Sequence, residues 1–299
     1  MAHDAGAARL LFSWLKPLHK QLRFYVAGPA REILEQERPH SANETSLEAC
    51  LNNCRLLLSG TGWTSDLEHR ARSIAAEYNM NSIAVLDHWV NYRERFQRQN
   101  ITVLPHTLWV SDTEALVLAQ KQFPTLMVQQ LPNHWLNNLA EKVTISRQNL
   151  APKTPAKPGK NLLYFLEPLR DHETGNPTGK EFEALDYWLA QLPKLMATEE
   201  LDSERTKLQL RLRPHPSEPR GKYMDWIRRN AQSWPLQLDS HKDLAVSIAN
   251  ADLTFGCETQ ALVAAMACGV PGFSTLPPSA PRCRLPHRQL QHLALADQI

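Results

Sequence analysis

Short apolar segments alternate with segments of helical periodicity along nearly all of the 299-residue chain. In the first half, short apolar runs that are each followed by a polar or glycine turn predict five strands, at residues 22–27, 55–59, 82–86, 107–110 and 126–130. Between them, residues 66–79 and 112–123 carry apolar side chains at helical spacing, and Ser111 or Asp112 can cap the second of these helices. This alternation is typical of an α/β fold.

Residues 149–160, NLAPKTPAKPGK, contain three prolines, a glycine and three lysines without periodicity, which is typical of a linker. After it the pattern predicts strands at 161–166, 208–212, 252–255 and 270–274, and helices at 180–192, 223–231, 243–249 and 258–268. We therefore expect an N-terminal α/β domain over residues 1–148 and a C-terminal α/β domain over residues 161–299. Parallel sheets bind ligands outside the carboxyl ends of their strands, so the two Rossmann-like domains are expected to face each other across a cleft.

The chain opens with MAHDAGAARLLFSWL, a loop and a helix with no strand before His3. Either the first domain lacks its first strand or the start of the domain lies upstream. The helix at 10–22, with Lys16, Lys20 and Arg23, could dock on an acidic membrane surface, although a helix that faces its own core explains the same pattern.

Composition narrows the class of protein. With 42% hydrophobic and 21% charged residues, the chain is typical of a globular soluble protein, and its formal net charge of +2 lacks the basic excess of non-specific nucleic-acid binding. The five scattered cysteines are interpreted as buried thiols, not as a disulfide framework or a metal site. No apolar run approaches the length of a membrane span, and Asp4 lies where a signal peptide would be basic, so we expect a cytoplasmic protein.

The stretch LRLRPHPSE at 210–218 gathers cations at the end of a predicted strand. Arg211 and Arg213 should share one strand face and could bind phosphate, or they could pair with the acidic residues at 199–204 on a solvated edge strand. The His215–Pro216 pair favours a phosphate site, because proline fixes the backbone where the histidine leaves the sheet.

A second stretch, ADLTFGCETQALVAAMACGVP at 251–271, places a strand, a glycine, an acid and a helix start together. Gly256 lets a ligand approach the backbone, and Glu258 or Thr259 can hydrogen-bond a ribose or a phosphate. The alternative is that Glu258 only complements the helix dipole and that the small residues allow tight packing.

In this order the two stretches resemble the carboxyl half of GT-B glycosyltransferases, in particular the bacterial sialyltransferase and capsule-sugar transferase group. The resemblance implies that His215 contacts the donor phosphate and stabilises the leaving group, that Arg213, Pro216, Gly256, Glu258 and Thr259 complete the nucleotide site, and that no metal or other cofactor is required. It favours a CMP-sugar as the donor. The sequence departs from the group at Cys257 and Glu258, where two serines or threonines are common, and an acid here is similar to UDP-sugar enzymes.

In the amino half, HDAGAA at 3–8 resembles the first loop of such enzymes, where an Asp beside a glycine lies under the acceptor. Asp4, next to flexible Gly6, could therefore take the proton of the acceptor hydroxyl, or it could be an ordinary helix cap; His88 is the other candidate base. Two further strand-end loops carry candidates for binding the acceptor: Trp63, Asp87, His88, Asn91 and Arg93.

We therefore expect a glycosyltransferase that moves a sugar, such as a nonulosonic acid of the sialic or pseudaminic type, from a nucleotide-sugar to a bacterial surface glycan. A UDP-sugar hydrolase or 2-epimerase on the same fold is the alternative that Glu258 favours. A non-catalytic GT-B scaffold is the alternative that the missing first strand favours.

Overall fold

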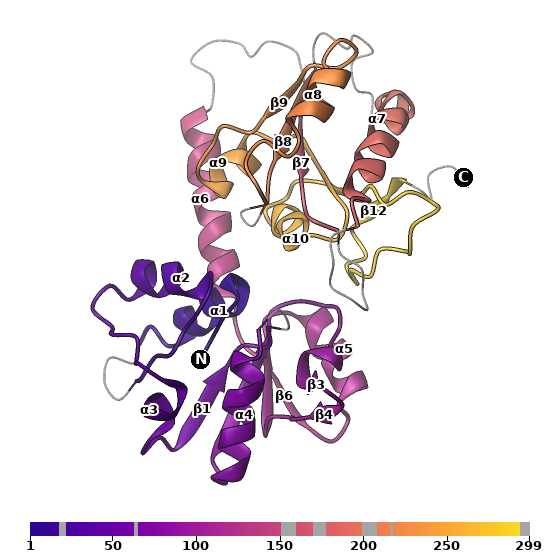
Figure 1. Ribbon diagram of the computed structural model, residues 1–299. Coiled ribbons are helices and arrows are strands. Elements are labelled where there is room, and N and C mark those ends of the chain that lie inside the picture. The colour runs from indigo at the N-terminus through magenta and orange to yellow at the C-terminus, as the bar shows by residue number, and fades with distance from the viewer. Residues whose placement is uncertain are drawn as a thin grey trace. The chain divides into compact units, whose positions relative to one another are not determined.

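The computed structural model describes residues 1–17, 22–62, 65–150, 160–169, 178–198, 208–215 and 218–293 (Figure 1). The chain divides into two compact units, Met1–Asn137 and Asn138–Ile299. The division falls inside helix α6 (His134–Leu150), ahead of the predicted linker, and residues 151–159 of that linker lie outside the described residues. Each unit contains a parallel sheet with helices beside it, so the α/β class predicted from the alternating pattern is confirmed.

The first unit is built on a four-stranded parallel sheet in the order β1-β2-β5-β6. Its strands are β1 (Leu56–Ser59), β2 (Asn81–Leu86), β5 (Thr107–Val110) and β6 (Met127–Gln130). Its helices are α1 (Ala5–Trp14), α2 (Ala30–Glu37), α3 (Leu47–Leu51), α4 (Leu67–Glu77) and α5 (Thr113–Gln122). A short 3-10 helix (Glu94–Phe96) leads into the small antiparallel pair β3 (Gln97–Arg98) and β4 (Ile101–Thr102).

The strand predicted at 22–27 is wrong, because the structure has only two isolated bridges there, Ala2 with Val26 and Phe24 with Asn43. The side chain of Asn43 accepts from the N–H of Val26 at 2.8 Å and donates to its carbonyl at 3.1 Å. The amide side chain of Asn43 thus satisfies the backbone N–H and carbonyl of Val26, which a neighbouring strand would otherwise bind.

The first two residues of the chain lie along β1. The Met1 amino group donates to the Leu58 carbonyl at 2.9 Å, and the N–H of Gly60 donates to the Met1 carbonyl at the same distance. With the bridge from Ala2 to Val26, this places Met1 and Ala2 between β1 and the Val26 segment. The loop that follows, His3 and Asp4, therefore starts at the carboxyl edge of the sheet.

The apolar side of α1 belongs to the core of the first unit. Leu10, Leu11 and Phe12 are buried there with Phe24 and Val26. The rings of Phe12 and Phe24 meet edge to face with centroids 5.7 Å apart. Burial of these side chains supplies the hydrophobic free energy that holds the start of the chain in place.

The second unit is built on a six-stranded parallel sheet in the order β12-β11-β10-β7-β8-β9. Its strands are β7 (Lys160–Phe165), β8 (Leu208–Arg213), β9 (Leu236–Leu238), β10 (Leu253–Gly256), β11 (Gly272–Ser274) and β12 (Gln291–His292). Its helices, after α6, are α7 (Glu181–Thr198), α8 (Met224–Asn230), α9 (Leu244–Ala249) and α10 (Gln260–Ala267). Numbered along the unit, the strands run 6-5-4-1-2-3, which is the order of dinucleotide-binding sheets, with the switch point between β7 and β10.

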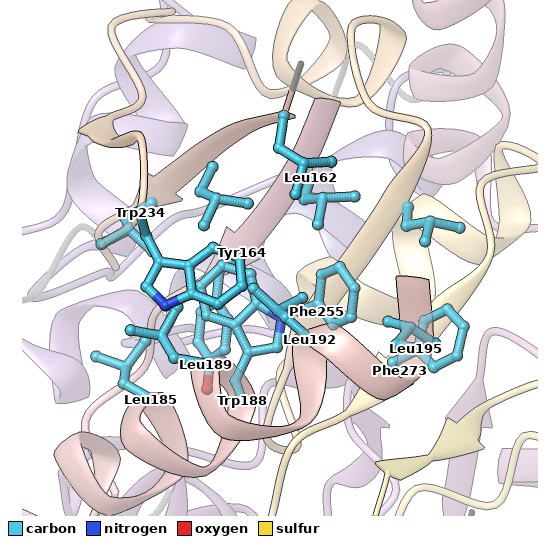
Figure 2. Close-up of a cluster of buried hydrophobic side chains, with 14 of the residues drawn as sticks. Leu162, Tyr164, Leu185, Trp188, Leu189, Leu192, Leu195, Trp234, Phe255 and Phe273 are labelled. Carbon is cyan, nitrogen blue, oxygen red and sulfur yellow. The ribbon is translucent and has the colours of Figure 1, made fainter. Parts of the chain in front are cut away.

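The two faces of this sheet differ in chemistry. On one face, Tyr164, Phe255 and Phe273 pack with Trp188 of α7 in a buried aromatic cluster (Figure 2). The centroid of the Trp188 ring lies 4.9 Å from that of Tyr164 and 5.3 Å from that of Phe255. Leu210 and Leu212 of β8 point to the same face, as the period-2 pattern requires. The opposite face of β8 carries the two arginines of the LRLR stretch.

Candidate functional site

Asp4 lies at the N-cap position of α1, but its side chain makes no capping hydrogen bond. Instead, its Oδ1 lies 2.8 Å from Nδ1 of His3, and the two side chains are 31% and 23% exposed. Two glycines make room for the pair. A Cβ on Gly62 would lie 2.7 Å from Oδ2 of Asp4, and a Cβ on Gly28, whose φ of +53° also favours glycine, would lie 2.5 Å from Nε2 of His3.

The backbone of His3 is fixed on both sides. Its N–H donates to Oε1 of Glu68 at 2.7 Å, and its carbonyl accepts from the N–H of Ala30 at 3.0 Å. Glu68 is fully buried, its burial raises the pKa of the carboxyl, and its Oε2 has no hydrogen-bond partner within the described part of the chain. His3 and Asp4 are therefore a hydrogen-bonded His–Asp pair on a fixed backbone. The sequence interpretation missed His3, because Glu68 and Gly28, which hold it, are distant along the chain.

Asp87, the first residue after β2, anchors the neighbouring loop. Its Oδ1 lies 3.2 Å from Nη1 of Arg95, which also donates to the carbonyls of Thr61 and Val90. Burial raises the pKa of Asp87 and the charge of Arg95 opposes this, while the negative charge of Asp4 raises it further. The structure thus places Asp87 where the charge of Asp4 acts on it, and it engages the Asp87 carboxylate in an internal ion pair.

The other residues predicted to bind the acceptor are distributed around this loop. Nδ1 of His88 accepts from the N–H of Trp89 at 3.0 Å, and Asn91 takes a left-handed backbone with φ of +57°. Arg93 is exposed and donates to Gln122 at the end of α5. Gly6 lies in the first turn of α1. Trp63 lies outside the described residues.

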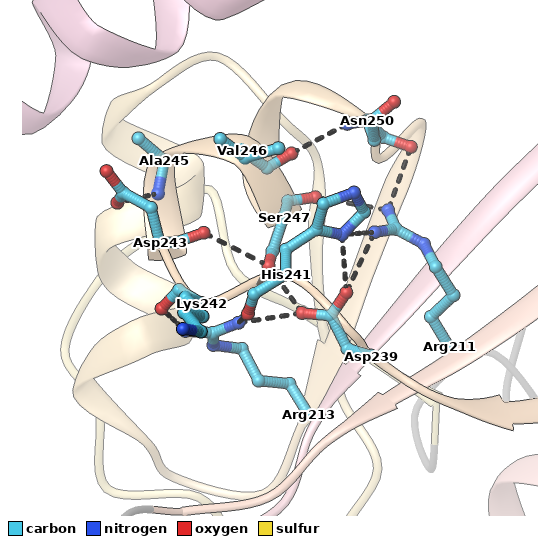
Figure 3. Close-up of polar contacts among 10 residues, drawn as sticks. All are labelled: Arg211, Arg213, Asp239, His241, Lys242, Asp243, Ala245, Val246, Ser247 and Asn250. Carbon is cyan, nitrogen blue, oxygen red and sulfur yellow. Dashed lines mark hydrogen bonds and ion pairs between the residues drawn. The ribbon is translucent and has the colours of Figure 1, made fainter.

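Arg211 and Arg213 share one strand face, as predicted, and both bind Asp239, whose side chain is completely buried (Figure 3). Arg213 also donates to Ser247 and to the carbonyls of His241 and Lys242. Burial alone would raise the pKa of Asp239, but hydrogen bonds from Ser247, His241 and Arg213 and the charge of Arg211 lower it.

This network accounts for the cations at the end of β8. Acidic partners at 199–204 were the alternative, and residues 199–207 lie outside the described residues. The structure shows Asp239 as the partner of Arg213, and β8 is an inner strand of the sheet, flanked by β7 and β9.

His215 is exposed, and its backbone is hydrogen-bonded to Glu218. The N–H of Glu218 donates to the His215 carbonyl at 3.0 Å, and the N–H of His215 donates to Oε2 of Glu218 at 3.3 Å. The other oxygen of Glu218 accepts from Lys222 at 2.8 Å and from Tyr223, and Lys222 also binds Glu181. Pro216 lies outside the described residues.

The residues predicted around α10 lie at the switch point of the sheet. Gly256 ends β10, and a Cβ there would lie 3.2 Å from the Phe165 carbonyl, so the two strand ends approach closely. Thr259 caps α10 by accepting from the N–H of Ala261. Glu258 pairs with Arg284 at 2.8 Å and also accepts from its N–H.

The sequence interpretation missed Glu167, which lies two residues after β7 and whose side chain reaches the turn after β10. Its Oε1 accepts from the N–H groups of Cys257 at 3.0 Å and Glu258 at 2.5 Å. Burial raises the pKa of Glu167 to about 7, the charges of Glu258 and Glu218 raise it as well, and the two N–H groups oppose them. A carboxylate of the protein thus fills the position where we expected a ligand's phosphate.

A hollow of about 380 Å³ lies at the amino ends of β1 and β2, on the opposite edge of the first sheet from His3 and Asp4. None of the predicted site residues lines it. The lining residues are Leu51, Asn52, Asn53, Cys54, Arg55, Tyr78, Asn79 and Met80.

All five cysteines are free thiols. Within the described ranges, no group of three or more His, Cys, Asp or Glu side chains is arranged to hold a metal ion. Over the same ranges, no helix has both the length and the apolar character that crossing a bilayer requires.

The sequence matches no protein-family model and no curated protein. Among solved structures, UDP-GlcNAc 2-epimerase from Methanocaldococcus jannaschii is similar with a TM-score of 0.57 and 10% identity, over 91% of this chain and 82% of that one. A putative UDP-N-acetylglucosamine 2-epimerase from Listeria monocytogenes gives 0.55 and 13%, over 94% and 79%. MurG from Acinetobacter baumannii gives 0.51 and 11%, over 94% and 78%. At these identities the likeness shows the fold, GT-B with two Rossmann-like units, and the fold alone.

Proposed function

We propose that the protein is a nucleotide-sugar-dependent glycosyltransferase in which the first unit supplies the base and the second unit binds the donor. The positioned His3–Asp4 pair carries this proposal. It lies at the carboxyl edge of a parallel sheet, where ligands of α/β folds bind, and both side chains remain partly exposed.

The chemistry of the pair suits inverting transfer. When His3 donates from Nδ1 to Asp4, its Nε2 is left to accept a proton, and the carboxylate stabilises the imidazolium that forms. Attack of an acceptor hydroxyl on the anomeric carbon requires removal of that hydroxyl's proton. Glu68 and Ala30 fix the backbone of His3, so the base is held before the acceptor binds.

The donor half is proposed from the strand ends of the second sheet. His215 follows β8, Gly256 ends β10, and Glu258 and Thr259 follow β10. These strand ends lie next to the switch point where dinucleotide-binding sheets hold their ligands. His215 is exposed and can share a proton with a departing phosphate. Arg213 contributes by fixing the end of β8 through Asp239. We propose a CMP-activated nonulosonic acid as the donor and a surface glycan as the acceptor. This choice rests on the resemblance of the RPHP and GCET stretches to the bacterial sialyltransferase and capsule-sugar transferase group.

The test is a panel of CMP-, UDP- and GDP-sugars with a mixture of glycan acceptors, followed by release of the nucleotide. We expect Asp4→Asn to lower turnover by about 10²-fold, because the amide no longer stabilises the imidazolium, while donor affinity is kept. His88→Ala is measured beside it, because His88 is the other candidate base. Since its ring contacts Trp89 and its Nδ1 accepts from the Trp89 N–H, we expect that variant to stay within a few-fold of wild type. Asp4→Asn turnover close to wild type would remove the pair from the mechanism.

A UDP-sugar 2-epimerase is the second candidate, favoured by Glu258 and by the two epimerases among the similar structures. An epimerase needs no acceptor. Conversion of UDP-GlcNAc to its 2-epimer by the protein alone, followed by NMR of the sugar, would replace the transferase proposal.

A further inference from the structure

Glu167 joins two loops that follow neighbouring strands at the switch point of the second sheet. It lies two residues after β7, and its Oε1 binds the N–H groups of Cys257 and Glu258, the first two residues after β10. The strand ends are in close approach, because a Cβ at position 256 would lie 3.2 Å from the Phe165 carbonyl, which is tighter than an ordinary contact. The side chain of Glu167 therefore fastens the Cys257–Glu258 turn to the end of β7.

Among the described residues, the side chains that act on this carboxylate are acidic or neutral. Glu258 lies in the fastened turn and Glu218 in the loop after β8, and both charges act on Glu167. The Tyr164 phenol and the Cys257 and Cys283 thiols interact with it as well. The one cation at the turn, Arg284, is paired with Glu258, and within the described part of the chain Glu167 forms no salt bridge. Desolvation, the two N–H groups and the charges of Glu258 and Glu218 together set its charge state.

We propose that Glu167 is a positioning residue that clasps the Cys257–Glu258 turn to β7, and that ionisation of its carboxyl favours opening of the clasp. The importance of the clasp for catalysis rests on the proposed function. While the clasp is closed, Glu167 accepts hydrogen bonds from the N–H groups of Cys257 and Glu258. A donor phosphate can accept from the same two N–H groups only after the clasp opens.

The direction of the pH effect follows from linkage. Burial between Glu258 and Glu218 raises the pKa of Glu167 from 4.5 to about 7, so the closed clasp holds a proton more tightly than the open, hydrated carboxyl does. Raising the pH from 4.5 to 7 therefore shifts the equilibrium toward the open turn. Between pH 5 and pH 7 the opening constant should rise by about tenfold to 40-fold, and the upper value corresponds to complete hydration of the carboxylate.

Amide hydrogen exchange of Cys257 and Glu258 in nucleotide-free protein, corrected for the intrinsic pH dependence of exchange, measures this opening. We expect the protection of both amides to fall by about tenfold to 40-fold between pH 5 and pH 7. In Glu167→Gln, whose amide oxygen can accept the same two bonds without a charge, protection should not change with pH. The Ala245 amide, which donates to exposed Asp243 in the same unit, is the control and should change less than the Cys257 and Glu258 amides.

Constant protection of the two amides in wild type between pH 5 and pH 7 would overturn the proposal, and so would an unchanged pH profile in Glu167→Gln. If that variant does not fold, the wild-type profile still decides. Because no nucleotide is present, failure of this experiment is separate from failure of the transferase proposal.

Discussion

Two carboxylates at the carboxyl edge of the second sheet, Asp239 after β9 and Glu167 after β7, differ in what surrounds them. Asp239 is bound by two arginines, a serine and a histidine, and these partners lower its pKa despite burial. Within the described residues, Glu167 is bound by two backbone N–H groups beside two other glutamates, and its pKa rises to about 7. The same sheet edge thus holds a permanent ion pair and a group that titrates near neutral pH.

The two sites have opposite linkage to stability. Because the pKa of Asp239 is lowered, its contribution is present above the ordinary value of 3.8 and is lost as the pH falls through the folded-state pKa. Because the pKa of Glu167 is raised, its contribution is present below 4.5 and is lost as the pH rises through about 7. Acid should therefore weaken the arginine network, while a rise in pH from 4.5 to neutral should weaken the clasp.

Among substitutions at the two carboxylate sites, Asp239→Ala is expected to have the largest effect on the free energy of unfolding. Removing the carboxylate leaves Arg211 and Arg213 without their common anion inside the fold, which should lower the free energy of unfolding by about 3–5 kcal/mol. Urea denaturation at pH 7 measures it. Asp225→Ala is the control, because Asp225 pairs with Arg228 on the exposed side of α8, and its unfolding midpoint should stay at the wild-type value. A midpoint for Asp239→Ala equal to that of Asp225→Ala would mean that the network does not support the fold.

A smaller effect of opposite sign is expected from Glu167→Gln. The neutral amide removes the cost of an ionised carboxylate at this position, so the free energy of unfolding should rise by about 2 kcal/mol at pH 8 and change by less than about 0.5 kcal/mol at pH 4.5. Urea denaturation of both proteins at the two pH values measures the difference. Destabilisation at pH 8 would show that the charge of Glu167 supports the fold instead of opposing it.

The smallest effect is expected from Glu258→Gln. Removing this charge takes away one like-charged neighbour, so the pKa of Glu167 should fall by less than about one unit. NMR titration of the Glu167 side-chain carboxyl reports the pKa directly. Glu183→Gln, at an exposed position of α7, should leave it unchanged. A rise in the pKa of Glu167 would contradict this expectation, because both the loss of the Glu258 charge and the release of Arg284 favour the ionised carboxylate.

The candidate site was predictable in its local parts. Asp4 next to a helix start, and Gly256, Glu258 and Thr259 between a strand and a helix, could be placed at strand edges because turn residues and apolar runs fix where elements begin and end. His3 could have been found as a histidine beside an acid. Its importance depends on Glu68 and Gly28, which no local pattern connects to it.

The sequence by itself determined the alternation of strands and helices and the two faces of β8. Period-2 alternation puts Leu210 and Leu212 on the core side and the arginines on the other, whatever the partners are. Only the tertiary structure decided what the charged groups do. The partner of Arg213 is Asp239, 26 residues away, and the turn that Glu167 holds is 90 residues away. Burial and neighbouring charges set a pKa, and both arise from segments that folding brings together, so the charge state of Glu167 cannot be derived from the residues beside it in the chain.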